Sequence, residues 1–146
     1  MKERKTMPFD KNFVPALRFA VMSDIHIDDE DCIEEQRFAK ALDDLKNLCS
    51  SDERYSGFDA LVIVGDFASR GSEIQMRKVK KILDAGLPAD VRLIMTMASH
   101  EYMTDGEENA LRRFDEIFGL TPDTHAVING FDFIAVTTTR GCHFDD

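Results

Sequence analysis

Residues that bind metals or transfer protons follow three apolar runs of this chain. Residues 17–22 lead to Asp24 and His26, residues 61–64 lead to Asp66, and residues 91–97 lead to Ser99 and His100. In a parallel α/β sheet the carboxyl ends of the strands meet at one edge, where open sheets bind ligands. Two carboxylates and two imidazoles at that edge would form a metal or acid–base site. A hydrolytic metal centre is therefore the leading hypothesis.

The spacing of these residues suits cation binding. Asp24 and His26 are two residues apart, so both side chains of an extended segment can turn the same way and hold one cation. Gly65 lets the backbone turn sharply, so that Asp66 can lean over the sheet edge. Because a carboxylate has two oxygens, Asp66 could bridge a pair of cations that activate water and neutralise phosphoryl charge. Mixed nitrogen and oxygen ligands favour manganese, iron or zinc over calcium.

Each pattern by itself has an ordinary explanation. An Asp-x-His after a strand is often a helix cap or a hydrogen-bonded loop pair, and a Gly-Asp dipeptide is usually a turn. The acidic stretch 28–31 is expected to be a solvated loop leading into a helix, where negative charge suits the helix dipole, rather than a second cation site. What favours the metal site is the order of the patterns after successive strands.

The apolar periodicity predicts an α/β fold with mostly parallel strands and flanking helices, ending in a β-hairpin. Strands are expected at 17–22, 59–64 and 91–97. The hairpin is expected from 125–128 and 131–137 around the turn Asn129-Gly130. The order is therefore β-α-β-α-β-α-β-β.

Three helices are expected between these strands. The first carries an apolar stripe from 38 to 49, and an Asp31–Glu34 pair near its start has the spacing of a capping box. The second opens with the same spacing at Ser72–Gln75 and stops before Pro88. The third is expected to open at Thr104 and to close at Gly119.

The composition is that of a soluble globular domain. The chain has 146 residues, of which 43% are hydrophobic and 32% charged, and no apolar run is long enough to cross a bilayer. The first 13 residues lack the apolar stretch of a signal peptide, so we expect a cytoplasmic protein without a membrane partner. A net charge of −10 makes nucleic acid an unlikely surface-bound partner. Three cysteines without a CxxC spacing argue against a disulfide framework or a zinc knot.

The ordered set of motifs resembles that of the calcineurin-like metallophosphoesterases. Asp24-Ile25-His26, Gly65-Asp66 with Arg70-Gly71, and 98–101 (Ala-Ser-His-Glu) are similar to the first three motifs of that family, over roughly residues 17–140. The resemblance implies a metal-dependent hydrolase of phosphomonoesters or phosphodiesters with two divalent or trivalent metal ions. It implies that Asp24 and His26 bind the first ion, that Asp66 bridges both, and that His100 acts beside the phosphate as a catalytic residue.

The chain departs from the family pattern in its third motif. The resemblance implies an asparagine ligand to the second ion, where this chain has Ser99. A hydroxyl is a shorter and poorer neutral ligand than an amide oxygen, so the second ion is expected to be weak, bridged by water or absent. The alternative is that Ser99 simply caps the local turn.

The second departure concerns the later histidines, which in the family follow a further strand and occur in a Gly-His-x-His motif. Here only His125 and His143 remain; His125 is expected to be a surface or packing residue, and His143 lacks a strand-end context. We therefore expect a tail over 1–16 and, over 17–146, the N-terminal part of a metallophosphoesterase domain, half of a four-layer α-β-β-α sandwich. The apolar sheet face of such a half would be covered by the missing C-terminal half or by self-association.

Two other functions stay open. A scaffold that has lost its chemistry and acts as a binding or regulatory module would explain Ser99 and the missing histidines, although keeping four polar groups at one sheet edge is costly without a purpose. A plain nucleotide-binding domain is the least favoured, because 23–27 contains no glycine-rich phosphate loop.

Overall fold

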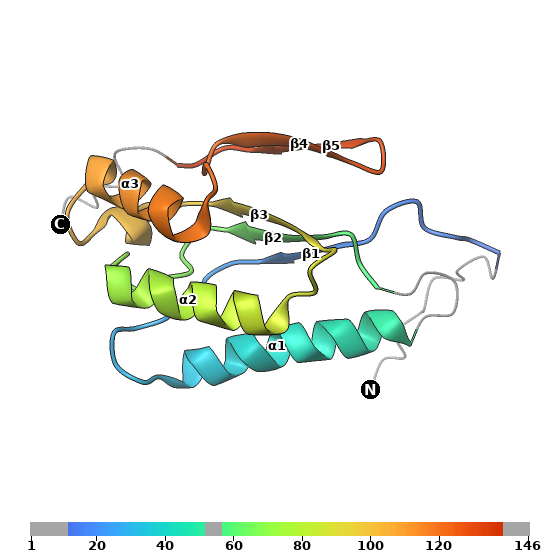
Figure 1. The fold of residues 1–146 in the computed structure, drawn as a ribbon, viewed down its shortest axis with the longest axis horizontal. Coiled ribbons are helices and arrows are strands. Elements are labelled where there is room, and N and C mark those ends of the chain that lie inside the picture. The colour runs from blue at the N-terminus through green and yellow to red at the C-terminus, as the bar shows by residue number, and fades with distance from the viewer. Residues whose placement is uncertain (1–11, 52–56, 139–146) are drawn as a thin grey trace, which may run out of the picture.

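A three-stranded parallel sheet organises the protein, with helices against one face and a hairpin over the other (Figure 1). The computed structural model describes residues 12–51 and 57–138. In chain order the elements are β1 (Phe19–Met22), α1 (Ile33–Ser50), β2 (Ala60–Val64), α2 (Glu73–Gly86), β3 (Arg92–Thr96), the 3₁₀ turn η1 (Ser99–Tyr102), α3 (Glu107–Phe118), β4 (Thr124–Ile128) and β5 (Phe131–Ala135). The predicted α/β fold and its final hairpin are confirmed.

The sheet is held in register by parallel pairing of β1 with β2 and of β2 with β3. Side chains alternate between its faces, and one face packs against α1 and α2. On that face Leu61, Ile63 and Met95 are almost completely buried. They form one core with helix residues such as Leu42 and Val79. The carboxyl ends of all three strands therefore point to the same end of the molecule.

The hairpin lies across the second face of the sheet (Figure 1). Its turn is tied to the residue before β2, because Asn129 Nδ2 donates to Asp59 Oδ1 at 2.9 Å. Its far end is tied to the residue after β3, because Thr137 Oγ1 donates to the Met97 carbonyl at 2.5 Å. The hairpin covers the β1 side of this face only in part: Phe19 contacts Phe133 of β5 edge to face, with ring centroids 5.2 Å apart, yet Phe19 and Val21 are still 49% and 56% exposed.

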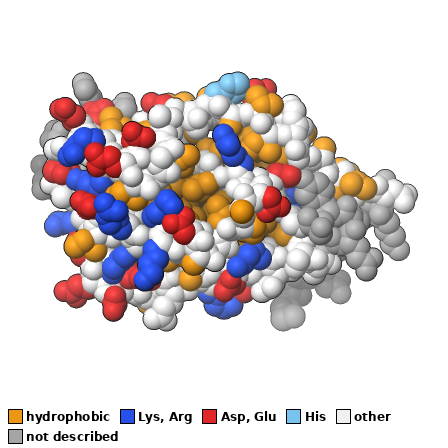
Figure 2. Space-filling model, viewed as in Figure 1, with side chains coloured by type: hydrophobic (Ala, Val, Ile, Leu, Met, Phe, Trp, Pro, Cys, Tyr) orange, Lys and Arg blue, Asp and Glu red, His pale blue; other side chains and the backbone are white. Residues whose placement is uncertain are grey.

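Figure 2 shows charged side chains over the helices and hydrophobic side chains gathered between them and the hairpin. A small hollow of about 210 Å³ lies beside β3 and is lined in part by Leu93, Leu120 and Ala126. The outer edge of β3 pairs with no other strand among the described residues. Within residues 12–51 and 57–138, no helix is long and apolar enough to span a membrane.

The helix starts show where local patterns were sufficient. The capping box at Ser72 and Gln75 is confirmed. The one predicted at Asp31–Glu34 is wrong: α1 begins after Cys32, which makes no side-chain cap. Asp31 lies instead 3.7 Å from the Lys78 ammonium of α2, so a tertiary ion pair replaces the local cap.

The third helix begins later than the sequence predicts. Thr104 does not open it, because its hydroxyl donates to the Arg70 carbonyl at 2.7 Å, and α3 starts after Gly106. The turn η1 was not expected, and it brings the residues that follow β3 back over the sheet edge. Residues 1–11 of the predicted tail and His143 lie outside the described residues.

Candidate metal centre

Three side chains of metal-ligand type meet beyond the carboxyl ends of the strands. His26, Asp66 and His100 each offer one ligand atom, and these atoms all lie within 4.8 Å of one another. The two imidazole rings are in contact edge to face, with centroids 4.6 Å apart. Each residue comes from the loop after a different strand, so the cluster depends on the parallel sheet.

The backbone at this edge adopts conformations that non-glycine residues rarely take. Asp24, His26 and Asp66 have φ values of 55°, 53° and 50°, in the left-handed region. Such a conformation costs roughly 1–2 kcal/mol for each residue. In the part of the chain that the structure describes, Asn129 is the only other non-glycine residue with positive φ, and it sits in the hairpin turn. Strain is thus concentrated where the sequence predicted the site.

Gly65 is required twice by this geometry. Its φ is 81°, and a Cβ added there would lie only 2.4 Å from Ala98 Cβ. The loops after β2 and β3 therefore approach more closely than any side chain at position 65 would permit. This close approach brings Asp66 beside His100, and the backbone N–H of His100 donates to Asp66 Oδ1 at 3.2 Å.

A hydrogen bond of the ring nitrogen Nδ1 sets the orientation of the His100 side chain. Nδ1 lies 2.7 Å from the carbonyl oxygen of Ser69. Because a carbonyl only accepts, Nδ1 must carry the proton, and Nε2 is left with its lone pair in the neutral ring. Ser69 is itself fixed, since its N–H donates to the Ile27 carbonyl at 2.9 Å and its hydroxyl to the His26 carbonyl at 3.0 Å. His100 thus presents one nitrogen for a metal or a proton transfer.

The other predicted residues lie outside the tight group. Asp24 is at its rim: its Oδ1 is 4.0 Å from His26 Nε2, and its side chain is 68% exposed. Ser99 begins η1 and is partly buried, and no hydrogen bond joins its hydroxyl to the described part of the chain. The suggestion that Ser99 caps the local turn therefore finds no support. His125 is exposed on the hairpin, with Nε2 2.5 Å from Asp132 Oδ1.

Glu101 belongs to the site, although no role was predicted for it from the sequence. It is completely buried and accepts hydrogen bonds from the N–H groups of Asp66 (2.9 Å), Ala68 (3.0 Å) and Ala98 (2.8 Å). Burial raises the pKa of Glu101 to about 6, an effect that these three donors oppose. The available signal was an acidic residue directly after His100 in a segment following an apolar strand.

The donor set fits a metal ion. Metal–ligand distances of about 2.0–2.2 Å place two donors of one ion no more than about 4.4 Å apart. Donors within 4.8 Å therefore need to close by only a few tenths of an ångström. Two imidazoles and a carboxylate suit manganese, iron or zinc. A fourth donor, Asp24, stands near His26 on the exposed side.

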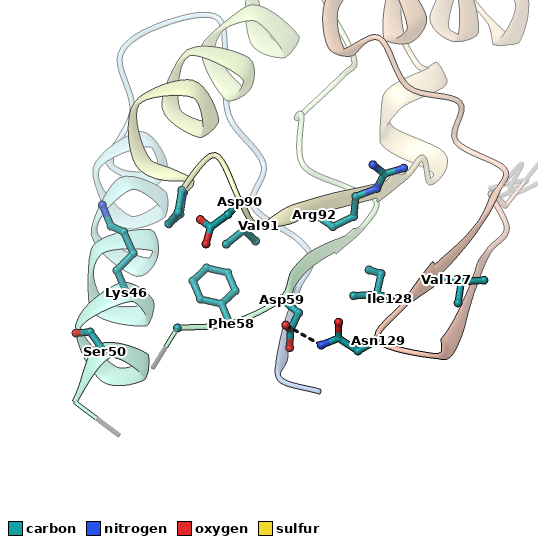
Figure 3. A pocket seen from close by; sticks show the side chains of 12 residues that line it. Lys46, Ser50, Phe58, Asp59, Asp90, Val91, Arg92, Val127, Ile128 and Asn129 are labelled. Atoms are coloured by element: carbon teal, nitrogen blue, oxygen red, sulfur yellow. Dashed lines mark hydrogen bonds between the residues drawn. The ribbon is translucent and has the colours of Figure 1, made fainter. Parts of the chain in front are cut away.

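A hollow larger than the one beside β3 lies at the opposite, amino end of the strands (Figure 3). It has a volume of about 890 Å³, and its walls include Phe58, Asp59, Arg92 and Asn129. Asp59 is occupied there by hydrogen bonds: Oδ1 accepts from Asn129 and Oδ2 from the Arg18 N–H at 2.7 Å. No group of three metal-ligand side chains occurs here among the described residues. The chemistry is therefore concentrated at the carboxyl edge.

Comparison with known protein families shows to which family this chain belongs. The family model of the calcineurin-like phosphoesterases matches residues 17–144, nearly the whole chain. The chain belongs to this family. It contains a metallophosphoesterase domain, and the His26, Asp66 and His100 cluster lies where the carboxyl ends of its strands meet. No curated protein matches the chain closely enough to count as a relative.

Proposed function

We propose that this protein hydrolyses phosphoester bonds at a dinuclear metal centre built on the carboxyl edge of its sheet. The observation that carries the proposal is the convergence of His26, Asp66 and His100 within 4.8 Å, in a member of a phosphoesterase family. Asp24 and His26 would hold the first ion, and Asp66 would contribute to holding both. Bound ions supply a Lewis acid that activates water and neutralises charge on the phosphoryl group.

His100 is the proposed catalytic residue. Its Nδ1 proton is held by the Ser69 carbonyl, so Nε2 is the nitrogen that exchanges a proton: in the protonated ring, Nε2–H would donate to a phosphoryl oxygen or give its proton to the departing oxygen. Its ring touches that of His26, so it lies within reach of a substrate held at the metal ligands. The backbone N–H of His100 also fixes Asp66 Oδ1, which couples the catalytic residue to the bridging ligand.

The second ion is proposed to bind more weakly than the first. Ser99 supplies a short hydroxyl where an amide ligand is expected, and because His100 is assigned to catalysis, the three clustered side chains leave only His26 and Asp66 as ligands. We therefore expect slow turnover that depends on a high metal concentration. This weakness also favours the second candidate function, a metallophosphoesterase-like scaffold that acts as a binding module.

The open part of the sheet supports a proposal about partners. Phe19, Val21 and Val64 are each about half exposed on the face that the hairpin covers only in part. Apolar side chains on an incompletely covered sheet face favour a further layer, either a C-terminal half of the same domain or a second copy. Sedimentation of the chain at two concentrations separates these cases, because only self-association depends on concentration.

The experiment for the proposed activity uses p-nitrophenyl phosphate and bis-p-nitrophenyl phosphate with added Mn²⁺. Wild type should hydrolyse at least one of them slowly, and both Asp66→Asn and His100→Ala should abolish turnover. Turnover that survives Asp66→Asn would refute the assignment of the centre. Tight Mn²⁺ binding without any turnover would favour the scaffold.

A further inference from the structure

Glu101 joins the loops that follow two different strands. Oε2 accepts from the N–H of Asp66, after β2, and from that of Ala98, after β3, at 2.9 and 2.8 Å. Oε1 accepts from the N–H of Ala68 at 3.0 Å. One carboxylate therefore fixes three backbone positions within a few residues of the metal cluster.

The third loop is connected through Asp66. The N–H of His26, after β1, donates to the Asp66 carbonyl at 3.0 Å. Asp66 is thus held at its N–H by Glu101, at its carbonyl by His26 and at its carboxylate by the N–H of His100. Glu101 therefore fixes the loops after β2 and β3 directly and is connected to the loop after β1 only through Asp66.

Glu101 is itself held in place by its backbone. A Cβ added to Gly71 would lie 2.0 Å from the Glu101 carbonyl oxygen, so the two chain segments are in direct contact. The guanidinium of Arg113 in α3 donates to the Gly71 carbonyl and also pairs with Asp105. The support of the carboxylate therefore extends into α3.

Burying a carboxylate without a cationic partner costs free energy, which hydrogen bonds offset only in part. Glu101 has no exposed surface, and no lysine or arginine side chain in residues 12–51 and 57–138 pairs with it. Its three partners are all backbone N–H groups, and one belongs to Asp66, which is held in the left-handed region. Ligand residues act well only when their supporting contacts hold them within about 0.5 Å. Glu101 supplies such a contact directly at the strained residue.

We propose that Glu101 is a positioning residue that sets the metal affinity of the cluster by holding Asp66 and His100 in place, without touching metal or substrate. The inference rests on the proposed function for the identity of the ligands. The competing explanation is that Glu101 stabilises the fold alone, in which case metal affinity follows overall stability.

The test compares Glu101→Gln with Glu116→Gln, the same chemical change at an exposed position of α3. An amide has one acceptor oxygen, so at least one of the three N–H groups would face a donor. Without metal, amide hydrogen exchange at Asp66, Ala68 and Ala98 should accelerate in Glu101→Gln and stay unchanged in Glu116→Gln. Titration with Co²⁺ alone, followed by its visible absorption, should show binding weakened about 10- to 100-fold with an altered spectrum.

A core variant separates positioning from stability. Val79→Ala shortens a completely buried side chain of α2 and should lower the melting temperature while leaving Co²⁺ affinity and spectrum at wild-type values. If Glu101→Gln does not fold, Glu101→Asp keeps the charge with a shorter reach and should show the same loss of affinity.

Four outcomes would overturn the proposal. They are wild-type Co²⁺ affinity and spectrum in the Glu101 variant, unchanged exchange at the three amides, an equal affinity loss in Val79→Ala, and no Co²⁺ binding by wild type. Failure of the proposed hydrolysis is a separate result, because weakened Co²⁺ binding in Glu101→Gln supports positioning even when no phosphoester is cleaved.

Discussion

The two ends of the parallel sheet differ in how their polar groups are used. At the amino end, the larger hollow contains Asp59, but both carboxylate oxygens already accept hydrogen bonds from Arg18 and Asn129. At the carboxyl end, Asp66 and His100 are fixed by backbone contacts, and ligand atoms meet within 4.8 Å. The strained residues Asp24, His26 and Asp66 lie at this end. Strain and convergent ligand atoms, rather than cavity size, indicate where the chemistry is.

The largest expected effect is a loss of folding stability at Gly65, and Gly130, which has nearly the same φ, serves as the comparison. Gly65 (φ 81°) and Gly130 (φ 82°) belong to opposite ends, and only Gly65 has a close neighbour for an added Cβ. Gly65→Ala should lower the free energy of unfolding by roughly 3 kcal/mol, from strain and overpacking together. Gly130→Ala should lose only about 1–2 kcal/mol. Urea unfolding measures both, and equal losses would contradict the close approach of the β2 and β3 loops.

The next effect compares a carboxylate from each end. Asp66→Asn removes a charged ligand, while asparagine tolerates the left-handed backbone, so the fold should be retained and Mn²⁺ affinity should fall more than about 10-fold. Asp59→Asn makes the same change beside the larger hollow and should leave Mn²⁺ affinity unaltered. Calorimetric titration with Mn²⁺ measures both affinities. A loss of affinity in Asp59→Asn would indicate that the metal binds at the amino end of the sheet instead.

A smaller effect is expected at Ser99. Ser99→Asn should strengthen the second metal site, because an amide oxygen reaches further and is a better neutral donor than a hydroxyl. The metal concentration for half-maximal hydrolysis should fall severalfold, while His100→Ala in the same background still abolishes turnover. An unchanged metal requirement would show that position 99 does not contact the second ion.

The smallest effect concerns the ion pair of Glu35 and Lys78, which links α1 to α2 at 2.8 Å. The hydrogen bond from Lys78 lowers the pKa of Glu35 below its usual 4.5. Because the folded-state pKa is the lower one, the stabilisation is present above pH 4.5 and is lost as the pH falls through the folded value. Glu35→Gln should lower the melting temperature by about 2 °C or less at pH 7, and the difference should disappear once the pH has fallen below the folded-state pKa of Glu35. Metal affinity should not change; if it does, the carboxyl edge is coupled to the helix layer.

Most of the fold could be predicted because its determinants are local. Apolar runs gave the strands, Ser72 and Gln75 marked the start of α2, and Asn129-Gly130 marked the hairpin turn. The start of α1 was missed because Asp31 lies beside Lys78, 47 positions later in the chain, instead of capping the helix. A tertiary ion pair of this kind leaves no local pattern.

The candidate site was predictable in its residue types and order but not in its support. The strand-end positions of His26, Asp66 and His100 follow from the parallel sheet. The left-handed backbone and the burial of Glu101 do not, because both depend on contacts between loops about 35 residues apart. Asp24 remains in the proposed ligand set, and it lies at the exposed rim of the cluster, with Oδ1 4.0 Å from His26 Nε2.

The most direct test of the central claim is anomalous diffraction from crystals of the protein grown with Mn²⁺. We expect an anomalous peak at the carboxyl edge, within about 2.5 Å of ligand atoms from His26 and Asp66. A weaker second peak should lie on the other side of Asp66, toward His100 and Ser99. A carboxyl edge without a peak, or a peak confined to the hollow beside Asp59, would contradict the claim.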